Sequence, residues 1–236
     1  MKITRSVSAR LKLKRRREIQ RLIAVPLSYD LDRLARLFHT DKANAEHGYS
    51  RLYKRHLPAR KTVRKVLEIG IGGTESTHGY ETLDGGASLR MWQAYFRGAT
   101  VVGVDIYPKS VTGPRIVVEQ GSQDDPDFLA MIVRRHGPFD VIIDDGSHIG
   151  RHQVITLAHT FRALRPGGVY AIEDLDTAYR ANWEGGPPGT AETSVDLLKG
   201  TVDDVLRRHW DLHLTALPVD EVHVYDQIAF LVRGRG

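Results

Sequence analysis

The 236-residue chain contains no cysteine, which excludes structural disulfides, thiolate zinc sites and a cysteine nucleophile. It also lacks any apolar run near the roughly 20 residues that a membrane-spanning helix needs. The short apolar run at residues 22–25 is too brief for a signal peptide, and it stops at Pro26 without a small-residue cleavage site. These absences together favour a cytoplasmic protein with no membrane span.

Acidic residues are nearly absent from residues 1–27, where Glu18 is the only acid beside a cluster of arginines and lysines. The arm therefore supplies much of the net charge of +5. Such an arm can contact nucleic acid or an anionic surface, but it has no interleaved aromatic residues to stack on bases. We interpret it as a solvated basic arm. A nucleic-acid-binding protein or an RNA methyltransferase that uses this arm is the alternative function.

The remaining chain alternates between short β-branched apolar runs and helical patterns. Strands, some with their turns, are expected at residues 65–74, 100–105, 115–123, 141–143, 169–172, 212–215, 222–225 and 228–232. Helices are expected at residues 27–38, 49–56, 89–96, 124–133, 154–164 and 195–209. This order predicts an α/β fold: a Rossmann-like, doubly wound, mainly parallel sheet with an antiparallel C-terminal strand and a short N-terminal helical cap.

Two of the expected strands end in pairs of acids, Asp144-Asp145 and Glu173-Asp174. The carboxyl ends of parallel strands meet at one edge of a sheet, so these carboxylates are expected to lie together and to attract a cation. All-oxygen ligands favour Mg²⁺ or Mn²⁺. His148, three residues after Asp145, can reach the same place. The competing interpretation is a solvated acidic rim.

A second alternative uses His152, one helical turn beyond His148, to build an Asp/His/His zinc site with Asp145. That site would leave Glu173 and Asp174 without a role. The sequence therefore favours the oxygen-ligand site.

A glycine-rich turn follows the first expected strand, in Glu68-Ile69-Gly70-Ile71-Gly72-Gly73. Glycines there allow the backbone to approach a ligand closely, and Asp105 at the end of the next strand is placed to bind ribose hydroxyls. The spacing differs from the dinucleotide G-x-G-x-x-G pattern, which argues against an NAD-dependent oxidoreductase. The intact acid and histidine set argues against a catalytically inactive scaffold.

Two further segments are candidates for covering a ligand. Residues 28–60 form the helical cap, which is expected to bring Lys42, Tyr49 and Tyr53 over a cofactor. Residues 178–189 are too rich in glycine and proline for a regular element, and they are expected to form a substrate-covering loop.

Several motifs in this order resemble those of class I S-adenosylmethionine-dependent methyltransferases. The resemblance is greatest to the metal-dependent sugar O-methyltransferases of macrolide mycinose and javose pathways, and to a compact enzyme that methylates the 1-hydroxyl of 3-O-methylmannosides. The larger macrolide enzymes have an additional N-terminal domain, so the chain is expected to match their catalytic domain, at residues 61–236. The motifs are His39-Thr40-Asp41-Lys42, residues 67–73, residues 86–92, Gly121-Ser122-Gln123-Asp124-Asp125, Ile143-Asp144-Asp145-Gly146-Ser147-His148 and Ile172-Glu173-Asp174-Leu175.

This resemblance implies that Asp145, Glu173 and Asp174 hold magnesium and that His148 is the general base. The expected S-adenosylmethionine site comprises Lys42, Tyr49, Glu68, Gly70, Ser88, Asp105, Ser122, Gln123 and Asp144. The implied function is Mg²⁺-dependent methyl transfer to a hydroxyl of a sugar or glycoside. The acceptor would be a mannoside of a methylmannose polysaccharide precursor or a deoxysugar of a glycosylated natural product. A homodimer is also expected.

Overall fold

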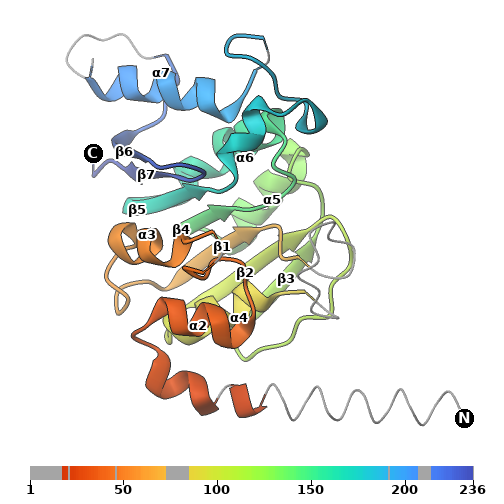
Figure 1. The fold of residues 1–236 in the computed structure, drawn as a ribbon, viewed down its shortest axis with the longest axis vertical. Coiled ribbons are helices and arrows are strands. Elements are labelled where there is room, and N and C mark those ends of the chain that lie inside the picture. The colour runs from red at the N-terminus through yellow and green to blue at the C-terminus, as the bar shows by residue number, and fades with distance from the viewer. Residues whose placement is uncertain are drawn as a thin grey trace, which may run out of the picture.

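The computed structural model describes residues 18–20, 22–45, 47–72, 85–190, 192–206 and 214–235. Its centre is a seven-stranded sheet in the order β3-β2-β1-β4-β5-β7-β6 (Figure 1). Strands β1 to β5 are parallel, whereas β7 runs antiparallel to β5 and β6 antiparallel to β7. The sequence-based fold prediction is therefore confirmed. Within the described part of the chain, no helix combines the length and apolar character needed to cross a membrane.

The elements follow one another along the chain in the expected alternation. The strands are β1 (Lys65–Ile69), β2 (Thr100–Asp105), β3 (Ile116–Gln120), β4 (Phe139–Asp144), β5 (Leu164–Ile172), β6 (Val219–Val224) and β7 (Ala229–Arg233). The α-helices are α2 (Leu31–Phe38), α3 (Tyr49–His56), α4 (Ala87–Tyr95), α5 (Pro126–His136), α6 (Gly150–Thr160) and α7 (Ser194–Leu206). Short 3₁₀ turns are η1 (Phe161–Ala163), η2 (Leu175–Tyr179) and η3 (Ala181–Trp183).

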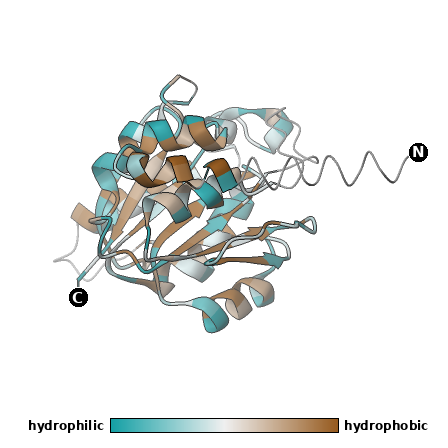
Figure 2. Cartoon of the chain, turned by 90° about the horizontal axis from the view of Figure 1, so that it is seen from below, coloured by the Kyte–Doolittle hydropathy of each residue, from teal (hydrophilic) through white to brown (hydrophobic). Residues whose placement is uncertain are grey.

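Alternate residues of the buried strands face two separate hydrophobic clusters, one on each side of the sheet. Val66, Val101 and Val141 pack toward α2, α3 and α4, whereas Leu67 and Ile142 pack toward α5, α6 and α7. Figure 2 shows hydrophobic residues along the strands and helices on both sides of them. The near-continuous apolar runs in the sequence reflect this burial on both faces.

Several expected boundaries differ from the structure. Strand β5 begins at Leu164 rather than at Val169, because Pro166 and its two glycines are accommodated in the strand next to a register shift in β4. Leu214 and Thr215 are not in a strand, since Thr215 is instead held by the buried carboxylate of Asp204. The C-terminal strands form a hairpin at the sheet edge.

Some expectations lie outside the described residues. These are residues 1–17 of the basic arm, most of the insert at residues 73–84, and the end of the last helix at residues 207–213. The roles assigned to these segments stay predictions.

The strand register brings the ends of β1, β2, β4 and β5 to one level. Ile69 pairs with both Val104 and Asp144, and Asp144 pairs with Ile172. Consequently Gly70, Asp145 and Glu173, which follow β1, β4 and β5, leave the sheet beside Asp105, the last residue of β2.

Gly70 is required where two of these strand ends meet. Its φ is +81°, and a Cβ atom at this position would lie only 1.9 Å from the backbone carbonyl oxygen of Asp145. A larger residue at position 70 would therefore push the β4 end away from β1, in addition to the cost of the left-handed backbone.

We predict that Gly70→Ala lowers the free energy of unfolding by about 3 kcal/mol or more, because it adds a backbone clash to left-handed strain. Gly72→Ala is the matched control, since its φ is +61° but no atom of the described residues lies within 4 Å of the added methyl group. The control should lose only about 1 kcal/mol. Equal losses by chemical denaturation would contradict the steric argument.

Candidate active site

A pocket of about 580 Å³ opens at the carboxyl ends of the parallel strands. Its walls come from the strand ends and the loops that follow them, the loop before α3, the starts of α4 and α6, the segment after β5, and the turn between β6 and β7. The lining residues include Lys42, Gly70, Ser88, Asp105, Ser122, Gln123, Asp145, His148, Asp174, Arg180 and Trp183. This is the edge where α/β sheets of this kind bind ligands.

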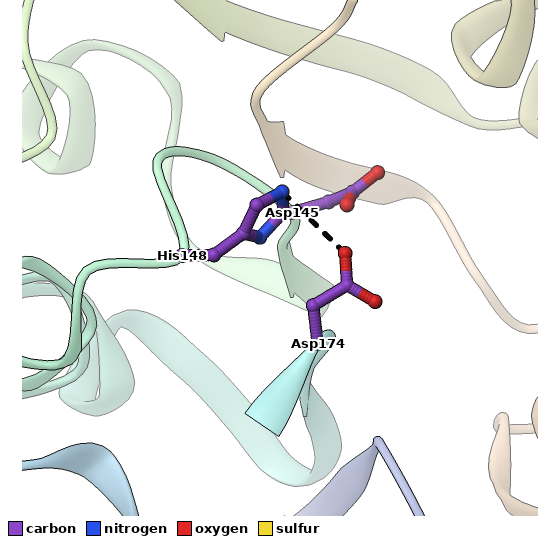
Figure 3. A group of neighbouring side chains, drawn as sticks. All are labelled: Asp145, His148 and Asp174. Atoms are coloured by element: carbon purple, nitrogen blue, oxygen red, sulfur yellow. Dashed lines mark ion pairs between the residues drawn. The ribbon is translucent and has the colours of Figure 1, made fainter. Parts of the chain in front are cut away.

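Asp145, His148 and Asp174 lie together in this pocket (Figure 3). One potential ligand atom from each lies within 4.8 Å of the others, and the His148 Nε2 is 3.4 Å from the Asp174 Oδ2. His148 Nδ1 is buried and has no hydrogen-bond partner among the residues that the structure describes. The sequence prediction placed two of these residues as ligands and one as a base, and the fold brings all three together.

Glu173 belongs to a buried ion-pair network that also includes Asp145. Its Oε2 accepts from the Lys42 Nζ at 2.9 Å, and its Oε1 accepts from the Tyr53 hydroxyl. The same Lys42 ammonium donates to the Asp145 Oδ2 at 2.6 Å. Lys42 thus connects two of the three carboxylates that the sequence assigned to the metal.

Burial and the neighbouring charges shift the pKa values of the groups in this network. Burial raises the pKa of Asp145 to about 6, although the Lys42 ammonium opposes the shift. Burial, followed by the charge of Asp145, holds the pKa of Glu173 well above its usual range. Burial alone would lower the pKa of Lys42, but the Asp145 and Glu173 carboxylates outweigh it and raise that pKa. These pKa shifts describe a site in which carboxylates are crowded together and the Lys42 ammonium keeps its charge.

Backbone strain accompanies the two residues that face each other. His148 has φ +58° and Asp174 has φ +54°, which non-glycine residues adopt at a cost of about 1–3 kcal/mol each. The surroundings fix both: Tyr49 donates its hydroxyl hydrogen to Asp174 at 2.7 Å, and the Thr177 hydroxyl donates to the His148 carbonyl oxygen at 2.7 Å. Strain held in this way is typical of functional sites.

Glu68 lies behind the opposite wall of the pocket, where it is fully buried on β1. Its carboxylate accepts from the Ser88 hydroxyl at 2.7 Å and from the Trp92 Nε1 at 3.0 Å. Burial raises the pKa of Glu68 to about 7. Sequence reasoning missed Trp92, although its spacing of one helical turn from Ser88 placed both on the same face of α4.

Asp144 is also buried behind the wall. Its Oδ1 accepts from the Gln123 side-chain nitrogen at 3.1 Å, while the Gln123 side-chain oxygen accepts from the Ser147 backbone N–H at 2.6 Å. Burial raises the pKa of Asp144 to about 6. Asp144 therefore positions Gln123, which lines the pocket.

Asp105 lines the pocket at the end of β2. Its carboxylate accepts from the backbone N–H of Ile71 at 3.2 Å and from that of Tyr107 at 2.9 Å. A carboxylate has about four acceptor sites, so Asp105 retains capacity for a hydroxyl pair.

The predicted residues therefore divide into two groups. Lys42, Gly70, Ser88, Asp105, Ser122, Gln123, Asp145, His148 and Asp174 line the pocket. Tyr49, Glu68, Asp144 and Glu173 are not among the lining residues, and each bonds to one that is. His152 also lines the pocket, but it contacts Ser147 and Asp124 instead of joining the group around Asp145, which argues against the zinc alternative.

The donor atoms fit a divalent cation. Asp145 and Asp174 supply carboxylate oxygens, the ligands that Mg²⁺ and Mn²⁺ prefer, and the Glu173 carboxylate lies across the Lys42 ammonium from Asp145. The imidazole of His148 is then available for proton transfer.

The chain is similar to known proteins over most of its length. No protein-family model matches the chain. The chain is 41% identical over 216 residues to 8-demethyl-8-(2-methoxy-alpha-L-rhamnosyl)-tetracenomycin-C 3'-O-methyltransferase of Streptomyces olivaceus, covering 87% of this chain and 54% of the relative. It is 39% identical to mycinamicin VI 2''-O-methyltransferase of Micromonospora griseorubida, and this match covers 87% of this chain and 53% of the relative.

A solved structure of the MycE methyltransferase in complex with Mg, SAH and mycinamycin VI superposes on this chain with a TM-score of 0.77 at 39% identity. The match covers 87% of this chain and 55% of that one. The chain has the class I S-adenosylmethionine-dependent methyltransferase fold. The chain spans about half the length of the curated relatives that it matches.

We predict that Glu68 makes the stability of the folded chain depend on pH. Burial raises the pKa of Glu68 from 4.5 to about 7, so between these values the folded state keeps a proton that the unfolded state has released. Stability therefore falls as pH rises through this window and stays reduced above it. Glu68→Gln should remove this loss, gaining about 3 kcal/mol relative to the wild type between pH 4 and 8.

Denaturant titrations of the ligand-free wild type and variant, in chelator, measure this difference. Parallel stability–pH curves for the two proteins would contradict the assignment.

Proposed function

We propose that the chain transfers a methyl group from S-adenosylmethionine to a sugar hydroxyl of a glycosylated compound, with Mg²⁺ as the required ion. One observation carries the proposal: Gly70 and Asp105 share a single pocket with Asp145, His148 and Asp174. A donor site and an acceptor site must adjoin for methyl transfer, because the methyl carbon must lie in line with the attacking oxygen. The relatives named above, which are O-methyltransferases of glycosylated compounds, support the same reaction.

The donor would occupy the β1–β2 side of the pocket. Gly70 lets the backbone approach the cofactor, and Asp105 accepts hydrogen bonds from the ribose hydroxyls. Ile106 and Tyr107 are exposed beside Asp105 and line the pocket, so they can cover a planar base. Ser88, held by Glu68, and Gln123, held by Asp144, complete this side.

The acceptor would occupy the side formed by β4, β5 and the segment that follows. A divalent ion held by Asp145, Asp174 and Glu173 would orient the acceptor hydroxyl and increase its acidity. His148 takes the hydroxyl proton as the oxygen–carbon bond forms and the sulfur–carbon bond of the donor breaks. S-adenosylhomocysteine is then the second product.

The rim of the pocket provides groups suited to a carbohydrate. Trp183 and Arg180 come from the segment after β5, where the Arg180 guanidinium lies 6.0 Å from the Trp183 ring centroid. An aromatic face and several polar groups are suitable for a sugar ring and its hydroxyls. We propose that the acceptor is a deoxysugar of a glycosylated natural product or a mannoside, and that residues 178–189 contact it.

Methylation assays over a panel of glycosylated natural products, deoxysugars and mannosides test the proposal. We predict turnover on at least one glycoside with Mg²⁺ present, and its loss in excess chelator, because the carboxylates then lack the cation that orients the acceptor. Adding Mg²⁺ back should restore the rate. Undiminished turnover in excess chelator would contradict the metal requirement, and methylation of RNA alone would favour the alternative function.

We predict that His148→Asn lowers turnover by roughly two to four orders of magnitude, because the variant has no base at this position. S-adenosylmethionine affinity should hardly change, since His148 belongs to the acceptor side. His159→Asn is the control, because His159 is an exposed histidine on α6. Single-turnover rates and calorimetry measure both quantities. A near-normal rate for His148→Asn would exclude His148 as the base.

A further inference from the structure

Lys42 is one of the most completely buried charged residues in the described part of the chain. Its side chain is only 1% exposed, and its Nζ lies 2.6 Å from the Asp145 carboxylate, 2.9 Å from the Glu173 carboxylate and 3.7 Å from the Asp41 carboxylate. An isolated buried ammonium is very costly, so these partners are what keep Lys42 inside.

The chain around Lys42 is also fixed. The Lys42 backbone N–H donates to the Thr40 hydroxyl, and its carbonyl oxygen accepts from the Ser50 backbone N–H at the start of α3. Tyr53, one turn further along α3, donates its hydroxyl hydrogen to Glu173. The N-terminal helices therefore deliver a cation and a hydroxyl to two carboxylates that come from β4 and β5.

The formal charges explain why a lysine belongs here. Asp145, Glu173 and Asp174 converge at the edge of the sheet, and without a cation three carboxylates would repel one another in a buried place. Lys42 neutralises one of these formal charges and leaves a negative excess that a divalent cation can reduce. Lys42 thus compensates part of the negative charge of the carboxylates, and the divalent ion can compensate more of it.

We propose that Lys42 is an internal counter-cation, a positioning residue that holds Asp145 and Glu173 together before the divalent ion binds and that weakens the binding of this ion by its own positive charge. The inference rests on the metal requirement in the proposed function. It separates Lys42 from the cofactor-binding role that the sequence suggested, because its ammonium contacts the metal-side carboxylates.

The test compares thermal unfolding of the wild type and Lys42→Met, each in chelator and in saturating Mg²⁺. In chelator we expect the variant to unfold about 10 °C lower, because the buried carboxylates lose their only adjacent ammonium among the described residues. In Mg²⁺ the gap should shrink by at least half, since the ion replaces the lost charge. Calorimetry with Mn²⁺ should show at least about tenfold tighter binding to the variant.

Lys65→Met is the matched control. Lys65 is a partly buried lysine that donates to the carbonyl oxygens of His136 and Gly137, and it begins β1 at the opposite end of that strand from the pocket. Its loss of stability should be the same with and without Mg²⁺. An equal loss for Lys42→Met in both conditions, or weaker Mn²⁺ binding by that variant, would overturn the counter-cation role.

A second variant keeps the test decisive if Lys42→Met does not fold in chelator. Glu173→Gln removes one of the carboxylates that contact Lys42. Adding Lys42→Met to this variant should therefore lower its stability by less than half of what Lys42→Met loses in the wild-type background. A protein that fails to fold is counted as having the larger loss of stability. An equal or larger cost in the Glu173→Gln background would overturn the inference. If neither Mg²⁺ nor Mn²⁺ binds the wild-type protein, the proposed metal requirement is overturned. If the metal binds but Lys42→Met loses the same stability with and without it, this inference alone is overturned.

Discussion

Carboxylates buried at the carboxyl edge of the sheet are the constraint on which the rest of the site depends. Asp144, Asp145 and Glu173 are held there because the register of β1, β4 and β5 ends these strands at one level. Burial raises the pKa of each, so each needs a partner: Gln123 for Asp144, and Lys42 for the other two. The N-terminal helices are thus needed electrostatically as well as for packing.

The same constraint explains the strained backbone. Two positions with left-handed φ, His148 and Asp174, face each other across the pocket. Relaxing either would turn its side chain away from Asp145, and neighbouring hydroxyls from Tyr49 and Thr177 prevent this. The strained backbone keeps an imidazole and two carboxylates within 4.8 Å of one another, an arrangement that suits the proton transfer beside a cation that we propose.

Much of this could be predicted from the sequence because short apolar runs ending in acids determine both the strands and their polarity. Gly70, Asp105 and Asp145 were placed from that pattern alone, and the structure puts them on one pocket. The direction of the Glu173 side chain could not be predicted, since it depends on Lys42 and Tyr53, which lie more than 100 positions earlier in the chain. Likewise, the inclusion of Pro166 in β5 depends on a register shift in β4, which no local pattern reveals.

The fold is that of class I S-adenosylmethionine-dependent methyltransferases, whereas the bound cation belongs to the function proposed here. Crystals of the protein grown with Mn²⁺ and S-adenosylhomocysteine offer the most direct measurement, by anomalous diffraction at the manganese edge. We predict one strong peak between the carboxylates of Asp145 and Asp174, with His148 facing it. A clear map without a peak there, or with the peak at His152 and Asp124, would contradict it.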